Sequence, residues 1–247
     1  MYVLPRILMG SLLVAASPAQ AQPSAADILK EVDQIVGGNV DQTMSWDCLT
    51  EQGGKEVSRI AFKVQIKGTL WRRVDFESPA NLKGMRVLVR SPQETYIYLP
   101  EFRKVRRVAS HTKEQGFMGT AWDADDFALV VYGGVFAPES LVDKGLYWSL
   151  QLKRRPDQDF RYDRIELDVR KDMKQPIEIR YFDASGVKIK TEKRSDFVCG
   201  YGACSPRTVV VTDHTRGNLA SHMSLKDWKA NQGLSDGIFT LRALERE

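Results

Sequence analysis

Few residues in this chain are of the types and spacings that catalysis or metal binding requires. Histidine occurs only three times, and the separation of His214 and His222 matches no known pattern of zinc ligands. The chain also has no H-E-x-x-H metalloprotease motif, no glycine-rich phosphate loop and no G-x-G-x-x-G nucleotide motif. The sequence therefore predicts a protein without catalytic residues, without a metal site and without a cofactor.

One acidic group is of a type that could ligate a metal or act as a general acid. It comprises Asp123, Asp125 and Asp126. The run from Trp122 to Val131 is also typical of a short helix, which Thr120 can cap. Carboxylates in the first turn of a helix are stabilised by the helix dipole. We interpret the three aspartates as the start of a helix, because that explains them without a ligand.

The three cysteines are a second source of chemistry. Cys199 and Cys204 flank the flexible stretch 200–203, which is able to bring the two sulfurs together, so a disulfide is the favoured expectation and free thiols are the alternative. Cys48 remains outside that pair. It is either a small buried hydrophobic residue, which we favour, or a reactive thiol.

The most unusual local feature is a basic segment directly after the run Tyr96–Pro100. It contains Arg103, Lys104, Arg106 and Arg107. In a strand these cations project to both faces, which indicates a hairpin at the rim of a sheet. Such an edge can simply be solvated, which discourages pairing with other chains. Alternatively, the cations contact the phosphates of lipid headgroups or an acidic patch on a membrane partner.

Alternating apolar residues predict the sheet that has to position these groups. Ile60, Phe62, Val64 and Ile66 alternate with charged or polar residues, as in a strand with one buried face. The same period recurs in runs separated by short turns, which favours antiparallel neighbours. These runs are Val74–Phe76, Met85–Val89, Ile97–Leu99, Trp148–Leu152, Ile165–Val169, Ile177–Tyr181, Val187–Ile189 and Val209–Val211. The pattern indicates about ten strands.

Helical periodicity is expected in three places. Ser24–Val36 has apolar residues at helical spacing, and Ser235–Leu244 repeats that pattern near the end of the chain. Between them, residues 110–145 lose the strand period, and a second helix after the Trp122 run can begin near Pro138. We expect residues 110–145 to form a helical lid insertion.

Together these elements predict an α+β protein that is mainly antiparallel β. A sheet of about ten strands with one apolar face must curl or be covered, so we expect a curved, open (unclosed) β-barrel with helices over its concave face. Apolar residues on that face are either ordinary core or the lining of a ligand cavity. The candidate cavity residues are Phe62, Val64, Val74, Phe76, Val87, Val89, Ile97, Leu99, Phe117 and Met118.

The first residues have the layout of a secretory signal peptide. Arg6 precedes an apolar stretch and the string Ala19-Gln20-Ala21, so we expect residues 1–21 to be removed and residues 22–247 to form a single domain. No cysteine near the expected cleavage site is available for lipid attachment. The formal net charge of +4 falls by one when Arg6 is lost. This mild charge in an exported protein argues against binding of nucleic acid.

Several strings carry a family resemblance. They are Tyr98-Leu99-Pro100 with the basic segment up to Val108, Phe117-Met118-Gly119-Thr120, Asp125-Asp126-Phe127, and Gly233-Leu234 with Ile238-Phe239-Thr240. In these strings the chain resembles the periplasmic outer-membrane lipoprotein-sorting protein family, the LolA-like group, in its longer branch. The resemblance implies an unclosed β-barrel with a helical lid over an apolar cavity. It also implies a shuttle for lipids or lipidated proteins in the periplasm, without catalysis or cofactor.

The leading hypothesis is therefore a monomeric periplasmic carrier. Its cavity takes up lipid or the acyl chains of lipoproteins for transport toward the outer membrane, the segment around Phe117 and Met118 opens to admit them, and contact with membranes is transient. The alternative is a non-enzymatic accessory protein that docks on an inner-membrane transporter or exporter through the basic segment. Neither hypothesis involves nucleic acid.

Overall fold

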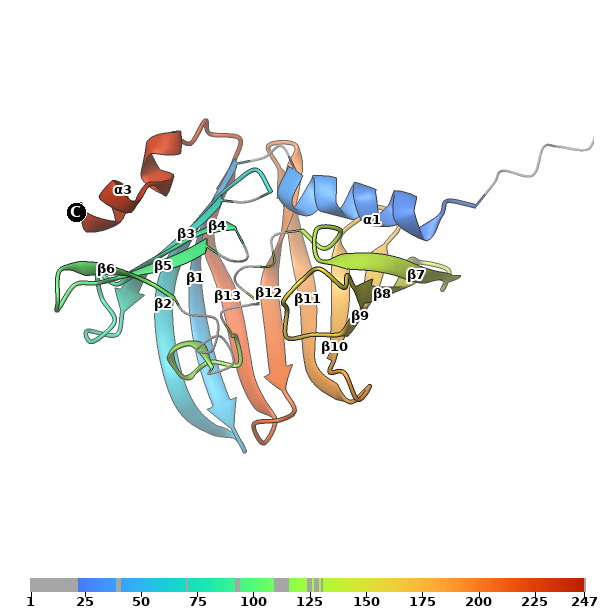
Figure 1. Ribbon diagram of the computed structural model, residues 1–247, viewed down its shortest axis with the longest axis horizontal. Coiled ribbons are helices and arrows are strands. Elements are labelled where there is room, and N and C mark those ends of the chain that lie inside the picture. The colour runs from blue at the N-terminus through green and yellow to red at the C-terminus, as the bar shows by residue number, and fades with distance from the viewer. Residues whose placement is uncertain are drawn as a thin grey trace, which may run out of the picture.

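A computed structural model of the chain describes residues 22–38, 41–69, 71–91, 94–108, 116–123, 126, 129 and 131–246, and its strands form one large sheet (Figure 1). Thirteen strands pair in the order β6-β5-β4-β3-β2-β1-β13-β12-β11-β10-β9-β8-β7. Their bounds are β1 Asp41–Gln52, β2 Lys55–Lys67, β3 Trp71–Ser78, β4 Arg86–Ser91, β5 Glu94–Leu99, β6 Lys104–Arg107, β7 Phe136–Asp143, β8 Tyr147–Arg154, β9 Arg164–Arg170, β10 Pro176–Phe182, β11 Lys188–Gly200, β12 Ala203–Asp213 and β13 Leu219–Ala230.

The strand order consists of two meanders that join in the middle of the sheet. β1 to β6 follow one another toward one end, and β7 to β13 run inward from the other end until β13 pairs with β1. Every one of these neighbouring pairs is antiparallel. Among the described strands, β6 and β7 end the order and do not pair with each other. The predicted class, a mainly antiparallel and unclosed curved sheet, is confirmed.

The expected number of about ten strands was too low. The clearest error concerns β7, because a helix was expected to begin near Pro138 and the structure has a strand there. β7 lies at the end of the sheet, where proline's missing N–H is tolerated, and the register shifts between Pro138 and Ser140. A proline near the start of a segment without clear periodicity is thus compatible with either a helix or an end strand.

One face of the sheet, here called the inner face, carries two hydrophobic clusters. The first joins β1 to β4 with β12 and β13, and includes Trp46, Phe62 and Val74. The second joins β7 to β11 and includes Leu150 and Ile179. Along β1 and β2 every second residue is buried, as a strand with one covered face requires.

The first helix covers the second of these clusters. α1 (Ala25–Asp33) is capped by Ser24, whose hydroxyl accepts a hydrogen bond from the Asp27 N–H at 3.2 Å, while the Asp27 carboxylate accepts one from the Ser24 N–H at 3.3 Å. A π-helical turn, η1 (Gln34–Gly38), continues the helix. Ile28 and Val32 are buried against the sheet. The helix expected from Ser24 to Val36 is therefore present, and it lies across the inner side of the sheet (Figure 1).

The C-terminal helices lie on the opposite face from the one expected. A 3-10 turn, η4 (Asp236–Phe239), and α3 (Leu241–Glu245) are separated by the extended residue Thr240. Phe239 and Leu244 pack on Leu88, whose neighbours Val87 and Val89 belong to the inner-face cluster. Because successive strand residues point to opposite faces, the C-terminal helices cover the outer face of β3 to β6.

The lid insertion is only partly within the described residues. Phe117–Gly119 forms a 3-10 turn, η3, in which Met118 has a φ of 51°. Trp122 and Asp123 are not helical, whereas Asp126 is helical. Most of the helix predicted from Trp122 to Val131 lies outside the described residues, and so does the predicted signal peptide. No helix within the described part of the chain is long and apolar enough to cross a membrane.

Candidate functional site

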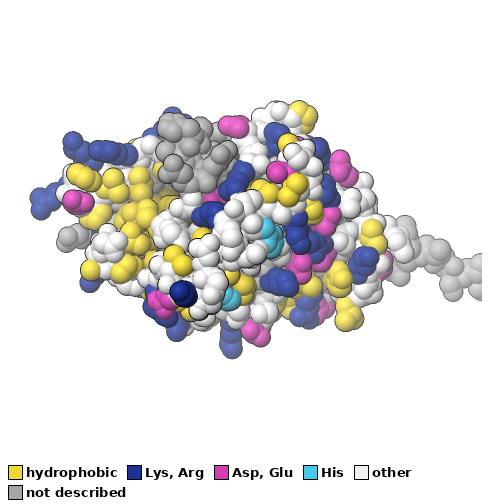
Figure 2. Space-filling view, turned by 90° about the horizontal axis from the view of Figure 1, so that it is seen from below, with side chains coloured by type: hydrophobic (Ala, Val, Ile, Leu, Met, Phe, Trp, Pro, Cys, Tyr) yellow, Lys and Arg dark blue, Asp and Glu magenta, His cyan; other side chains and the backbone are white. Residues whose placement is uncertain are grey.

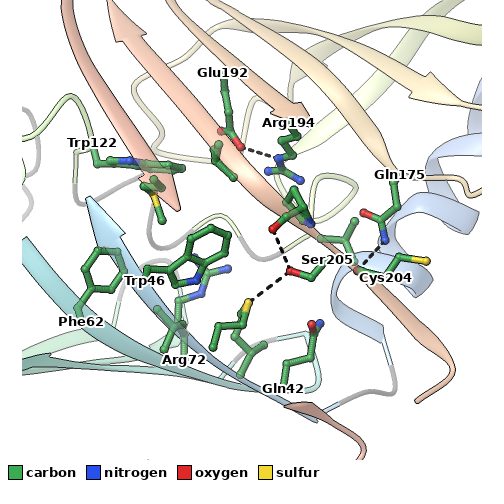
Figure 3. Close-up of a pocket in the computed structure, with 17 residues that line it drawn as sticks. Gln42, Trp46, Phe62, Arg72, Trp122, Gln175, Glu192, Arg194, Cys204 and Ser205 are labelled. Atoms are coloured by element: carbon green, nitrogen blue, oxygen red, sulfur yellow. Dashed lines mark hydrogen bonds and ion pairs between the residues drawn. The ribbon is translucent and has the colours of Figure 1, made fainter. Parts of the chain in front are cut away.

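A cavity lies on the inner face of the sheet where the two meanders meet (Figure 3). β1, β2, β11, β12 and β13 contribute to its wall, and Val36 of η1 and Trp122 of the segment between the meanders also line it. Its volume is ≈ 160 Å³. A cavity of about 150 Å³ holds one benzene molecule, so this space accommodates part of a hydrocarbon chain.

One wall of the cavity is apolar because of the strand period. Met44 and Trp46 point inward from β1, and across the ladder they pair with Val64 and Phe62 of β2. Met223 of β13 extends the same wall. All five side chains are buried. Such a wall binds hydrocarbon by removing apolar surface from water, which stabilises by about 0.8 kcal/mol per buried methylene.

The other wall carries charge. Glu192 and Arg194 stand two residues apart on β11, and the Arg194 Nε donates to the Glu192 Oε1 at 2.6 Å. The Tyr181 hydroxyl donates to the second oxygen of Glu192 at 3.0 Å, and Arg194 also donates to the Tyr132 hydroxyl at 3.3 Å. Arg72 reaches the cavity from β3. In Figure 3 Arg194 lies on the same side of the cavity as Glu192, whereas Arg72 lies beside Trp46 on the side of the apolar wall.

Burial perturbs the ionisation of this polar wall. Burial and then the nearby charge of Arg194 lower the pKa of Arg72 to about 10. For Arg194, burial acts in the same direction, but the Glu192 carboxylate outweighs it, so the pKa of Arg194 is raised. Burial raises the pKa of Tyr132 to about 12, and burial with the charge of Glu192 raises the pKa of Tyr181 well above its usual value. At neutral pH both tyrosines are neutral and both arginines are charged.

A buried ion cluster attaches the segment between the meanders to β11. The Lys190 ammonium donates to the Asp123 Oδ2 at 2.7 Å, to the Asp126 Oδ2 at 2.5 Å and to the Tyr162 hydroxyl at 2.7 Å. Arg161 also forms an ion pair with Asp123. Lys190 and the two carboxylates are almost completely buried. Asp126 is helical and its carboxylate accepts a hydrogen bond from the Asp123 N–H at 2.7 Å, as at the start of a helix, and Lys190 adds a buried cation that the sequence interpretation did not include. Asp125 lies outside the described residues.

Thr120 differs from its predicted role. Its hydroxyl donates to the Phe117 carbonyl at 2.6 Å and accepts from the Trp122 N–H at 3.2 Å. Because Trp122 is not helical, these bonds stabilise a turn and do not cap a helix.

The residues predicted to line a cavity divide into two groups. Phe62 and Val64 do line it. The remaining eight belong to the same inner-face cluster or pack against it, and for example the Phe76 and Phe117 rings lie 5.7 Å apart. These eight are Val74, Phe76, Val87, Val89, Ile97, Leu99, Phe117 and Met118. Phe117 thus packs on the Phe76 ring of β3, and Met118 packs against the same cluster.

The basic segment forms the predicted hairpin at the end of the sheet. β6 pairs with β5, Arg103 has a φ of 50° in the turn between them, and all four cations are exposed. Phe102 beside them is 53% exposed. Figure 2 shows Lys and Arg side chains gathered at the end of the molecule that carries β6 and α3, next to a hydrophobic surface. The segment lies far along the sheet from β11 and is a separate surface from the cavity wall that β11 forms.

The cysteines and other nucleophiles have structural surroundings. Cys199 and Cys204 form a disulfide with an S–S distance of 2.00 Å. Cys48 is buried, and burial raises the pKa of its thiol. Ser235 lies in the string Gly233–Gly237, which has the letters G-x-S-x-G of a nucleophile turn, but its hydroxyl accepts from the Gly237 N–H at 3.2 Å at the start of η4.

The two histidines within the described residues, His214 and His222, contact neighbouring side chains. His214 bonds to Thr191 and Asn218, and His222 lies beside Glu51. The described part of the chain contains no group of three or more His, Cys, Asp or Glu side chains placed to hold a metal.

Sequence reasoning did not identify Trp46, Arg72, Glu192 or Arg194. For Arg72 a signal existed, because it stands at the same period-two positions as Val74 and Phe76 and therefore shares their face. For β11 no such signal existed, since Lys190, Glu192 and Arg194 alternate with other polar residues and resemble a solvated face.

Comparisons with known proteins agree with this fold. A family model described as "Uncharacterized protein" matches residues 71–246. A DUF1329 family protein from Desulfovibrio piger has a similar structure, with a TM-score of 0.79, 21% identity, and coverage of 89% of this chain and 97% of that one.

Two further solved structures are similar. A domain described as an outer membrane lipoprotein-sorting protein from Vibrio parahaemolyticus has a TM-score of 0.77 and 18% identity, and the match covers 90% of this chain and 97% of that one. A LolA superfamily protein from Nitrosomonas europaea has a TM-score of 0.74 and 19% identity, and the match covers 90% of this chain and 100% of that one. At these identities the likeness establishes the fold alone. No curated protein sequence matches the chain.

Proposed function

We propose that this chain, which belongs to the uncharacterized protein family whose model matches residues 71–246, is a periplasmic carrier that binds lipid or the acyl chains of lipoproteins in its cavity. The fold is that of the lipoprotein-sorting and LolA superfamily structures described above. The observation that carries the proposal is the apolar wall of Met44, Trp46 and Phe62 beside a space that their own side chains do not fill. The role requires no catalysis.

The present cavity holds only part of an acyl chain, so uptake requires widening. Ligand pockets have volumes of about 300–1,000 Å³. Phe117 and Met118 cover the inner-face cluster next to the cavity without belonging to a strand. Displacement of this turn would add the apolar surface of β3 to β5 to the existing wall. The predicted cavity residues Val87 and Ile97 would then contact the ligand.

The direct test is uptake of a fluorescent fatty acid by protein purified without detergent, together with mass spectrometry of extracted lipid. Val209→Trp fills the cavity from β12, whereas Val210→Trp adds the same side chain on the other face of that strand. We expect Val209→Trp to abolish uptake and Val210→Trp to preserve it, with circular dichroism showing that both fold. Absence of acyl species and of uptake in the wild-type protein would refute the carrier role.

A second function is favoured by one observation, the exposed cations at the end strand β6 with the exposed ring of Phe102. In this alternative the chain docks on an inner-membrane transporter or exporter. Changing Arg103, Lys104, Arg106 and Arg107 to Glu should then abolish capture of the partner while fatty acid uptake continues. Loss of uptake with intact capture would exclude this role for the segment.

A further inference from the structure

The cavity combines an apolar wall with two guanidinium groups. Arg72 enters it from β3, beside the wall that Trp46 and Phe62 form, and Arg194 enters it from β11 on the other side (Figure 3). Among the described residues that line the cavity, the only carboxylate is Glu192. The charged side chains of the lining therefore consist of two cations and one anion.

Glu192 is already held by other groups. One of its oxygens accepts from Arg194 at 2.6 Å and the other from the Tyr181 hydroxyl at 3.0 Å, and the carboxylate is 3% exposed. Arg194 engages it through Nε and uses Nη2 for the Tyr132 hydroxyl. Glu192 thus orients Arg194 toward the cavity.

A guanidinium is suited to bind an anion in such surroundings. Its planar fork matches a carboxylate or phosphate, and charge-assisted hydrogen bonds strengthen where water is excluded. The low pKa of Arg72, caused by burial and by Arg194, indicates that its charged form is poorly solvated in this position. An anion placed between the two arginines would stabilise both charges.

We propose that the cavity binds the anionic end of an amphiphile, a carboxylate or a phosphate, between Arg72 and Arg194, with its hydrocarbon chain against Trp46 and Phe62. This inference rests on the proposed carrier function and specifies the class of its cargo. It distinguishes an ionised amphiphile from a neutral lipid of the same chain length, which gains only the apolar contacts.

The test compares ligands that differ only in charge. The delipidated full chain is titrated with a fluorescent fatty acid, with its methyl ester, and with a phosphate monoester of the same chain length. We expect the two anions to bind at least about tenfold more tightly than the ester, because the free energy of one charge-assisted hydrogen bond corresponds to about that ratio of dissociation constants. Inorganic phosphate should compete only at far higher concentration, since it lacks the chain. If it binds as tightly as the phosphate monoester, the amphiphile is the wrong class.

Three variants assign the effect to these residues. Arg72→Met should bring anion affinity down toward that of the ester. Glu192→Gln should tighten anion binding several-fold, because a competing negative charge is removed. Arg59→Met, which removes an exposed cation from β2, is the matched control and should change neither affinity.

The outcomes separate this inference from the carrier function. The anion site would be overturned, while the carrier function stands, if the wild-type protein binds the acid and the ester with equal affinity. It would also be overturned if Arg72→Met and Glu192→Gln both keep the wild-type ratio of acid to ester affinity. Failure of every acyl ligand to bind would overturn both. If Arg72→Met does not fold, the Glu192→Gln titration decides, because its predicted effect has the opposite sign.

Discussion

Replacing Lys190 by Met should destabilise the protein more than any surface change, because it leaves buried carboxylates without their shared cation. The Lys190 side chain is 1% exposed, and those of Asp123 and Asp126 are 0% and 2% exposed. Arg161 continues to contact Asp123 after the change. The loss therefore falls mainly on Asp126, which keeps the Tyr162 hydroxyl and the Asp123 N–H as its hydrogen-bond donors among the described residues.

The expected magnitude follows from the burial of the cluster. Removing one partner of a buried ion pair typically costs about 3–5 kcal/mol. In a chain of this size each kcal/mol corresponds to about 2–4 °C in Tm, so Lys190→Met should lower the Tm by roughly 6–20 °C. Equilibrium unfolding in urea at pH 7, followed by tryptophan fluorescence, measures the change in the free energy of unfolding.

Two further variants make this prediction specific. Lys153→Met removes an ion pair with Asp163 in which the lysine is 48% exposed, and it should cost less than about 1 kcal/mol. Adding Asp126→Asn to Lys190→Met should recover part of the loss, because one buried charge is then neutral. A cost for Lys190→Met no larger than that for Lys153→Met would refute the role assigned to the cluster.

Two other measurements test separate parts of the structure. Thiol titration should detect no reactive cysteine in the native chain, one in denaturant (Cys48), and three after reduction of the Cys199–Cys204 bond, and a native thiol signal would contradict the burial of Cys48. Burial acts to raise the pKa of Asp213, but hydrogen bonds from neighbouring groups outweigh burial, so the pKa is lowered. The ionised Asp213 therefore stabilises the fold at pH values above the pKa of the unfolded state, and this stabilisation is lost as the pH falls through the pKa of the folded state. Asp213→Asn should therefore destabilise at pH 7 and match the wild type near pH 2, as urea unfolding would show.

The strand period predicted most of the sheet but missed its centre. β1 and β13 have polar residues at inward positions, including Gln42, Thr50 and Ser221, which are all buried. Thr50 and Ser221 satisfy each other through a 2.8 Å hydrogen bond between their hydroxyls. A period-two search that expects apolar residues at inward positions cannot detect such strands, because the residue that satisfies the buried Thr50 hydroxyl lies 171 residues away in the sequence.

The side of the sheet that each helix covers was also only partly predictable. β4 carries Val87, Leu88 and Val89 in succession, and such a run is typical of a strand buried on both faces. This signal could have indicated that a helix covers the outer face there. The contribution of Lys190 and Glu192 to the interior had no comparable signal, since charged residues are buried only where tertiary partners exist.

The covered cavity follows from the unclosed order of the strands. β6 and β7 lie at opposite ends of the sheet, yet they are successive strands in the chain, so the segment between them has to cross the whole sheet. Phe117 and Trp122 show that it crosses the inner face, where Trp122 lines the cavity. Lys190 holds this crossing segment to β11 through Asp123 and Asp126. Any movement that widens the cavity beneath Trp122 must therefore strain these two contacts or pivot about them.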